Sequence, residues 1–128
     1  MKRRLNLQPR RKAMKYTMQI HVLAEKLGWK LLTECDGSDR EAKGCYCGDL
    51  LSWVMGRAKA DDVWLTVMGN INAVAVATLA DVSAIVLVES AVLDAEALAR
   101  ANQQEVAIYA TELPAYETAL QIAEAMQA

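Results

Sequence analysis

The 128 residues can build one hydrophobic core and are too few for two, so the sequence predicts a single domain. No apolar run reaches the roughly 20 residues of a membrane-spanning helix, and the first residues lack the apolar segment of a secretory signal. The odd count of three cysteines does not suit a disulfide framework, so we expect a cytoplasmic protein with reduced thiols.

Charge is unevenly placed along the chain. Residues 1–13 hold six of the 14 basic residues and no acidic one, whereas residues 14–128 hold the other eight and all 16 acidic residues. A basic arm can bind nucleic acid or an anionic membrane. We interpret it instead as a disordered extension before a domain at residues 14–128. The acidic composition of that domain argues against a DNA-binding face, so neither nucleic acid nor a membrane is an expected partner.

The first half of the domain predicts short elements separated by turn residues. In chain order they are a helix over 18–27, a strand over 29–33, a polar loop over 34–44, an extended segment over 45–47 and a helix over about 50–56. Thr17 is the expected N-cap of the first helix, and Gly28 its expected end. Gly48 and Asp49 are expected to open the second helix.

The second half repeats one unit three times. Apolar, β-rich runs at 62–67, 83–88 and 106–109 are each followed by a helical pattern, at 71–80, 94–103 and 114–126. Because the runs lack strict alternation, they are typical of strands buried on both faces. Strand–helix repeats at this spacing predict an α/β fold, a mainly parallel sheet with flanking helices. The alternating residues 72–78 also suit a strand, but their alanines favour a helix.

The densest stretch of the sequence, DREAKGCYCGDLLSWVMG, runs from Asp39 to Gly56. Gly44 and Gly48 are expected to give backbone freedom at the two ends of a short strand, and Asp49 to cap the next helix. Arg40 is a candidate for binding a phosphate or carboxylate with two hydrogen bonds. The favoured alternative is a structural ion pair with Asp39, Asp49 or a second subunit.

Two cysteines in this stretch also suit a metal. Cys45 and Cys47 lie two residues apart, so in an extended segment both sulfurs share one face. A closed site needs two further ligands, and only Cys35 and His21 offer soft donors, without motif spacing. We therefore expect no metal and no cofactor, and interpret the pair as buried thiols of a core strand.

No catalytic pattern is present in the sequence. The only histidine, His21, lies among apolar neighbours in the first helix, with nothing that would position it as a general base. Ser52 lies between Leu51 and Trp53 within a helix, which is not a nucleophile-elbow pattern. The sequence therefore predicts that the protein is not an enzyme.

The stretch D-R-x-x-x-G-x-x-x-G-D-L-L-S-x-V-M-G, followed by W-L-T-V and N-x-x-A-V-A, resembles the small stand-alone DRTGG-domain proteins. Similar domains occur in some phosphotransacetylases, beside CBS domains and in the N-terminal part of HPr kinase/phosphorylase. The glycine pair of the family name is missing, because Asp39-Arg40 is followed here by Glu41-Ala42-Lys43-Gly44. The resemblance implies an α/β domain, often dimeric, with a regulatory role and no established activity.

Some single-domain proteins of this type are labelled kinases, and the sequence speaks against that activity. Phosphoryl transfer of that class needs the phosphate-binding loop G-x-x-x-x-G-K-[ST]. No glycine of this chain is followed by Lys-Ser or Lys-Thr.

A ligand site is predicted where parallel strands end, because free N–H groups of helix N-termini gather there. The candidate ligand-binding residues are Arg40, Gly69, Asn70, Asn72, Glu89 and Ser90. Capping a helix explains only one of the two asparagines, and Thr111 is the expected N-cap before Pro114.

Two functions remain open. The first, which we prefer, is a non-catalytic regulatory or sensor domain that binds a small polar or anionic ligand and acts as a homodimer on a partner enzyme. The second is an interaction module without a ligand, in which Trp53, Met55 and Trp64 contribute to an interface.

Overall fold

The computed structural model describes residues 17–127, so the basic extension predicted for residues 1–13 lies outside the described part. The chain folds into five helices and two sheets within this range. The helices are α1 (Ile20–Leu27), α2 (Leu51–Arg57), α3 (Ile71–Ala80), α4 (Ala95–Gln104) and α5 (Ala115–Gln127). The strands are β1 (Met18–Gln19), β2 (Lys30–Leu31), β3 (Glu41–Ala42), β4 (Gly44–Cys47), β5 (Asp62–Thr66), β6 (Ala84–Leu87) and β7 (Ile108–Ala110).

The main sheet has five strands in the order β2-β7-β6-β5-β4. Strands β4 to β7 are parallel to their neighbours, and β2 pairs with β7 in the antiparallel direction. The predicted α/β class and mainly parallel sheet are therefore confirmed. The order also leaves β4 at one edge of the sheet and β2 at the other.

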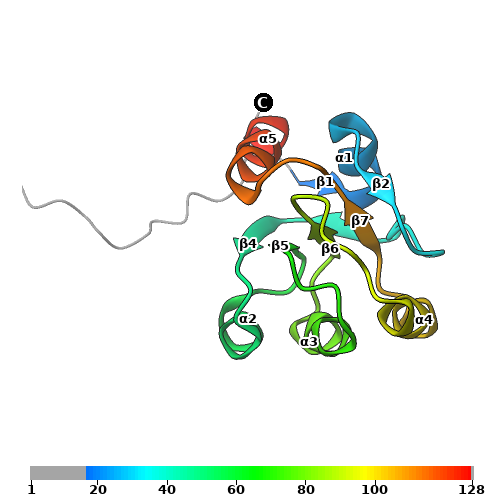
Figure 1. The fold of residues 1–128 in the computed structure, drawn as a ribbon. Helices are drawn as coiled ribbons and strands as arrows, with labels where there is room; N and C mark the ends of the chain where they lie inside the picture. Colours follow the sequence, from blue (N-terminus) through cyan, green and yellow to red (C-terminus); the bar gives the residue numbers. More distant parts are fainter. Residues whose placement is uncertain (1–16, 128) are drawn as a thin grey trace, which may run out of the picture.

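Helices cover both faces of this sheet (Figure 1). Helices α2, α3 and α4 lie on one face, and α1 and α5 lie on the other. Alternate residues of each strand point to opposite faces. Trp64 accordingly packs with Val54 and Ala77 on the three-helix side, while Val63 and Leu65 pack with Leu23 and Ile122 on the other side. Both sets are buried, which explains why the strands show no polar alternation.

The ambiguous residues 72–78 belong to α3, as predicted. Asn70 is the N-cap of the helix, and its side-chain oxygen accepts a hydrogen bond from the Ala73 N–H at 2.9 Å. Its buried alanines, such as Ala73 and Ala77, let the helix approach the sheet closely. No helix among residues 17–127 combines the length and the apolar composition needed to cross a membrane.

The N-terminal part of the domain differs from its prediction. Helix α1 begins at Ile20 with Gln19 as an N-cap that makes no side-chain bond, while Thr17 instead donates a hydrogen bond to the Glu41 carboxylate. Thr17 lies too early because Met18 and Gln19 pair with β3, a strand inside the predicted loop 34–44. Gly28 ends the helix in the left-handed conformation, as predicted, with a φ of 74°.

Two other predicted caps are wrong. Helix α2 begins at Leu51 after the extended residue Leu50, so Asp49 does not cap it. Helix α5 begins at Ala115, and the Thr111 hydroxyl instead accepts a hydrogen bond from the Leu113 N–H within the preceding turn. Asp49 and Thr111 therefore accept hydrogen bonds in the segments before the helices and do not cap the helices.

Candidate functional site

Arg40 joins three segments at the amino ends of the strands. Its Nη2 atom lies 2.8 Å from the Asp61 carboxylate, 3.2 Å from the Asp81 carboxylate and 2.9 Å from the Asp81 carbonyl oxygen. Asp61 and Asp81 precede β5 and β6, and both have left-handed backbones, with φ of 67° and 60°. The predicted structural ion pair is present, but its partners are neither Asp39 nor Asp49.

The backbone around Arg40 is equally well fixed. Its N–H donates to the Gly37 carbonyl at 2.8 Å, and its own carbonyl accepts from the Ile20 N–H at 2.9 Å. Burial alone would lower the pKa of Arg40, yet the hydrogen bond and charge of Asp61 and the charge of Asp81 raise it. Arg40 therefore stays charged and connects the start of α1 to the turns before β5 and β6.

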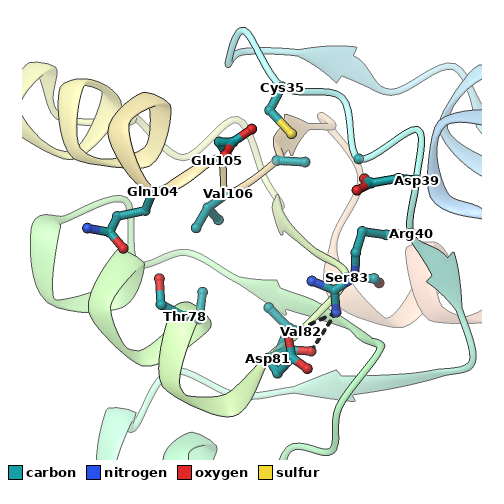
Figure 2. A pocket seen from close by; sticks show the side chains of 13 residues that line it. Cys35, Asp39, Arg40, Thr78, Asp81, Val82, Ser83, Gln104, Glu105 and Val106 are labelled. Carbon is teal, nitrogen blue, oxygen red and sulfur yellow. Dashed lines mark hydrogen bonds and ion pairs between the residues drawn. The ribbon is translucent and has the colours of Figure 1, made fainter.

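A cavity of about 220 Å³ opens beside Arg40 (Figure 2). Carboxylates of Asp39, Asp81 and Glu105 line it, and Arg40 is its one cation among the described lining residues. Because Asp61 and Asp81 already neutralise the guanidinium, the local charge opposes an anionic ligand. The cavity thus has a size suited to a few waters or a very small molecule, and an acidic rim.

The opposite, carboxyl ends of the strands hold the other five candidate residues, so the structure separates Arg40 from them. Gly69 allows two loops to meet, because a Cβ atom there would lie 2.0 Å from the Val92 carbonyl oxygen. The Gly69 carbonyl also accepts the Asp94 N–H at 2.8 Å. Asn70 caps α3, whereas Asn72 lies exposed in the first turn of that helix. Gly69 and Asn70 therefore have structural duties.

Glu89 and Ser90 form a left-handed pair one residue after the end of β6. Their φ angles are 56° and 57°, a conformation that costs non-glycine residues about 1 kcal/mol or more each. The pair is held because the Glu89 N–H donates to the Leu113 carbonyl and the Ser90 N–H to the Thr111 carbonyl, both at 3.0 Å. Strained backbone of this kind is concentrated at functional sites.

A groove of about 730 Å³ lies beside this pair. Its walls come from the end of α1, the strand β2, the loop after β6, helix α4 and the loop after β7, and they are mainly aliphatic. The volume is that of a small-molecule site, and the few polar lining groups are Lys30, Ser90, Thr111 and Glu112. Ser90 is the one predicted ligand residue in this lining.

Sequence reasoning missed Lys30, Leu32 and Leu98 in the groove. Lys30 reaches it because β2 pairs antiparallel with β7, which sets Lys30 opposite Ala110. No local pattern of the sequence announces this pairing, since β2 is two residues long and joins the sheet far from its neighbours in the chain.

The motif glycines and Asp49 are structural as well, though not as predicted. Neither Gly44 nor Gly48 has a positive φ, so left-handed backbone is not their purpose. The Gly48 carbonyl accepts the Trp64 indole N–H at 2.9 Å. One Asp49 oxygen accepts hydrogen bonds from the Thr66 hydroxyl at 2.7 Å and from the Val67 backbone N–H at 2.9 Å. The segment after β4 is thereby tied to the end of β5.

The cysteines differ from the expected buried pair. Cys45 is half-buried and Cys47 is exposed, and neither forms a disulfide. A hydrogen bond from the Cys45 thiol lowers the pKa of Cys47 to about 7, against the opposing effects of burial and of the Asp49 charge. Among residues 17–127, no three histidine, cysteine or acidic side chains come together as a metal site.

Of the two tryptophans predicted for an interface, one is buried and the other is exposed. Trp64 is fully buried, so it belongs to the core and cannot contact a partner. Trp53 is 52% exposed on α2, with the Arg57 guanidinium 3.6 Å from its ring centroid, and Met55 is also exposed. The sequence did not separate these cases because both tryptophans stand in apolar stretches.

No family model and no curated protein matches the chain. The structure is similar to the crystal structure of the CBS and DRTGG domains of the regulatory region of Clostridium perfringens pyrophosphatase, complexed with its activator, diadenosine tetraphosphate. The TM-score is 0.65 at 10% sequence identity, over 81% of this chain and 45% of that one. The chain thus spans less than half the length of that neighbour. This likeness confirms the expected DRTGG-type α/β fold and does not extend beyond the fold.

Proposed function

We propose that the chain is a non-catalytic regulatory domain that binds a small organic ligand in the groove beside Ser90. The groove carries this proposal because it lies at the carboxyl ends of β6 and β7, where open parallel sheets bind small molecules. The structural neighbour supports the same class of function, since it is a regulatory region in complex with an activator. In the preferred form of the proposal, a homodimer of the chain acts on a partner enzyme in the cytoplasm.

The lining of the groove favours a ligand with an apolar body and one anionic group. Leu27, Leu32 and Leu98 offer aliphatic contact, and Lys30 is the single cation among the lining residues that the structure describes. The Glu112 carboxylate offsets the charge of Lys30, so the groove has no net positive charge with which to bind a molecule that carries many negative charges. Of the predicted residues, Ser90 adjoins such a ligand directly, while Asn72 and Glu89 would contribute only from the rim of the strand ends.

The first test is native mass spectrometry of the protein purified without chelator, followed by calorimetric titration with adenosine 5′-monophosphate and diadenosine tetraphosphate. The monophosphate carries a single phosphate group, which suits the one cation of the groove better than the chain of four phosphates in the tetraphosphate. We expect either a retained organic mass or binding of the monophosphate in preference to the tetraphosphate.

The Lys30→Ala variant should weaken that binding about fivefold, because it removes one solvent-exposed charge-assisted contact. Lys59→Ala, at an exposed lysine outside the groove, is the matched control and should bind like the unchanged protein. A bare mass together with no binding of either probe up to about 1 mM would refute the ligand. If Lys30→Ala and Lys59→Ala weaken binding equally, the ligand does not bind in the groove.

An interaction module without a ligand is the second candidate, and helix α2 supports it. Leu50, directly before this short helix, is 58% exposed, and Trp53 and Met55 within it are 52% and 47% exposed. Exposed tryptophan and methionine are common anchors of protein interfaces. Sedimentation of the unchanged protein and of Trp53→Ala tests it: loss of a dimer in the variant, with ligand binding absent, would favour this function over the first.

A further inference from the structure

Cys45 and Cys47 lie side by side on β4, the edge strand of the main sheet. Residues two apart on a strand point to the same face, so both thiols lie on one side of β4, and hydrogen bonding from Cys45 lowers the pKa of Cys47. Cys47 is the exposed member of the pair and Cys45 the half-buried one. The third cysteine, Cys35, precedes β3 and lines the cavity at the amino ends of the strands, so it belongs to a different site.

We propose that Cys45 and Cys47 form a peroxide-sensitive dithiol site, in which Cys47 reacts first and Cys45 resolves the product. Thiols that are exposed, partly ionised and adjacent to a second thiol are the ones that hydroperoxides oxidise selectively. The pKa of Cys47, lowered to about 7 by hydrogen bonding from Cys45, makes its thiolate more accessible at neutral pH than that of an ordinary cysteine. The site requires no metal and no residue of the ligand groove.

The chemistry balances with hydrogen peroxide as the oxidant. The Cys47 thiolate attacks one peroxide oxygen, the O–O bond breaks, and the departing hydroxide takes a proton to become water. The sulfenic acid so formed is attacked by the Cys45 sulfur, which loses its proton, and hydroxide again leaves as water. Two thiols and one peroxide thus give one disulfide and two waters, and a small dithiol reductant reverses the step by exchange.

The disulfide requires the edge strand to contract. Residues two apart on an extended strand have Cα atoms about 6.6 Å apart and Cβ atoms about as far apart, whereas a disulfide needs Cβ atoms about 3.5–4.5 Å apart. Strand β4 can yield because β5 is its only neighbour in the sheet among the described residues. The contraction would displace Gly48, whose carbonyl accepts the Trp64 indole N–H.

Peptide mapping after one equivalent of hydrogen peroxide tests the proposal. Trypsin releases residues 44–57 with both thiols and residues 31–40 with Cys35, because cleavage follows Lys30, Arg40, Lys43 and Arg57. We expect the first peptide to lose two hydrogens and the second to stay unchanged. Oxidation of Met55 would add oxygen to the first peptide, so it cannot imitate this loss.

Variants assign the two roles. Cys45→Ser should stop at a sulfenic acid on Cys47 that dimedone traps, and Cys47→Ser should not react at the same dose. Alkylation of Cys47 at pH 7 should slow about fivefold in Cys45→Ala, where the lost hydrogen bond returns the thiol to an ordinary pKa. Disulfide formation should also shift the Trp64 indole resonance. Faster oxidation of Cys35, a disulfide only between chains, or an unchanged indole signal in the oxidised protein would overturn the proposal.

Discussion

Replacing Arg40 by alanine tests whether the Asp-Arg pair supports the fold or a ligand. The change removes a charge-assisted hydrogen bond to Asp61, whose side chain is 26% exposed, and an ion pair with the Asp81 carboxylate, whose side chain is 65% exposed. The first is worth about 1.5–3 kcal/mol and the second at most about 1 kcal/mol. Because one nitrogen makes both contacts, we expect a loss of about 2–3 kcal/mol in the free energy of unfolding.

Urea unfolding followed by tryptophan fluorescence measures this loss, and thermal unfolding should show a midpoint about 10 °C lower. Arg40→Lys should lose about half as much, since an ammonium group replaces only part of the contact. Arg57→Ala is the control, because Arg57 is exposed and pairs only with the surface of the Trp53 ring among the interactions described.

The effect of Arg40→Ala should not change between pH 6 and pH 9. Its partners raise the pKa of Arg40 in the folded state, so the stabilisation is complete below the unfolded pKa and disappears only as the pH rises through the folded one. A loss below about 0.5 kcal/mol would refute the structural role. Normal stability with lost ligand binding would restore Arg40 as a ligand residue.

Three further changes follow from single contacts. Gly69→Ala should cost more than about 2 kcal/mol in urea unfolding, because its methyl group would collide with the facing loop, whereas Gly56→Ala in open space should gain up to about 1 kcal/mol; equal effects would contradict this. Tyr109→Phe should abolish a loss of stability between pH 10 and 12, because burial raises the pKa of this tyrosine to about 12 in the folded state. Its contribution is complete below the unfolded pKa and is lost as the pH rises through the folded one. Asp49→Ala should cost about 2 kcal/mol of unfolding free energy and Asp49→Asn less, since the amide keeps an acceptor; a neutral alanine variant would refute the tie to β5.

Local patterns were sufficient to predict the repeating half of the fold. Strands β5, β6 and β7 and the three helices after them lie within a few residues of their predictions, because each is a continuous apolar run or a helical stripe. The first half was harder. Strands β1 and β3 have two residues each, and they exist only because distant segments pair with one another. A sequence window contains no signal for such a pairing.

The partners of Arg40 show the same limit at the site. Asp61 and Asp81 lie 21 and 41 residues further along the chain, so spacing favoured the nearer Asp39 and Asp49. The actual partners follow from the topology of the sheet: β5 and β6 are parallel neighbours, so the turns before them lie side by side at the amino ends of the strands. Sequence reasoning predicted the kind of interaction, an ion pair, but had no means to predict its geometry.

The two ends of the sheet differ in what they leave available for a ligand. At the amino ends, the most distinctive residues of the sequence neutralise one another: Arg40 pairs with Asp61 and Asp81, and the adjoining cavity is acidic. At the carboxyl ends, Ser90 has a strained backbone beside a larger groove, whose one cation among the described lining residues is Lys30. Charge that is already paired binds a further ion weakly, so the stretch that carries the family resemblance serves the fold. Recognition of a ligand then falls to ordinary residues at the opposite end, which is where substitutions should separate binding from stability.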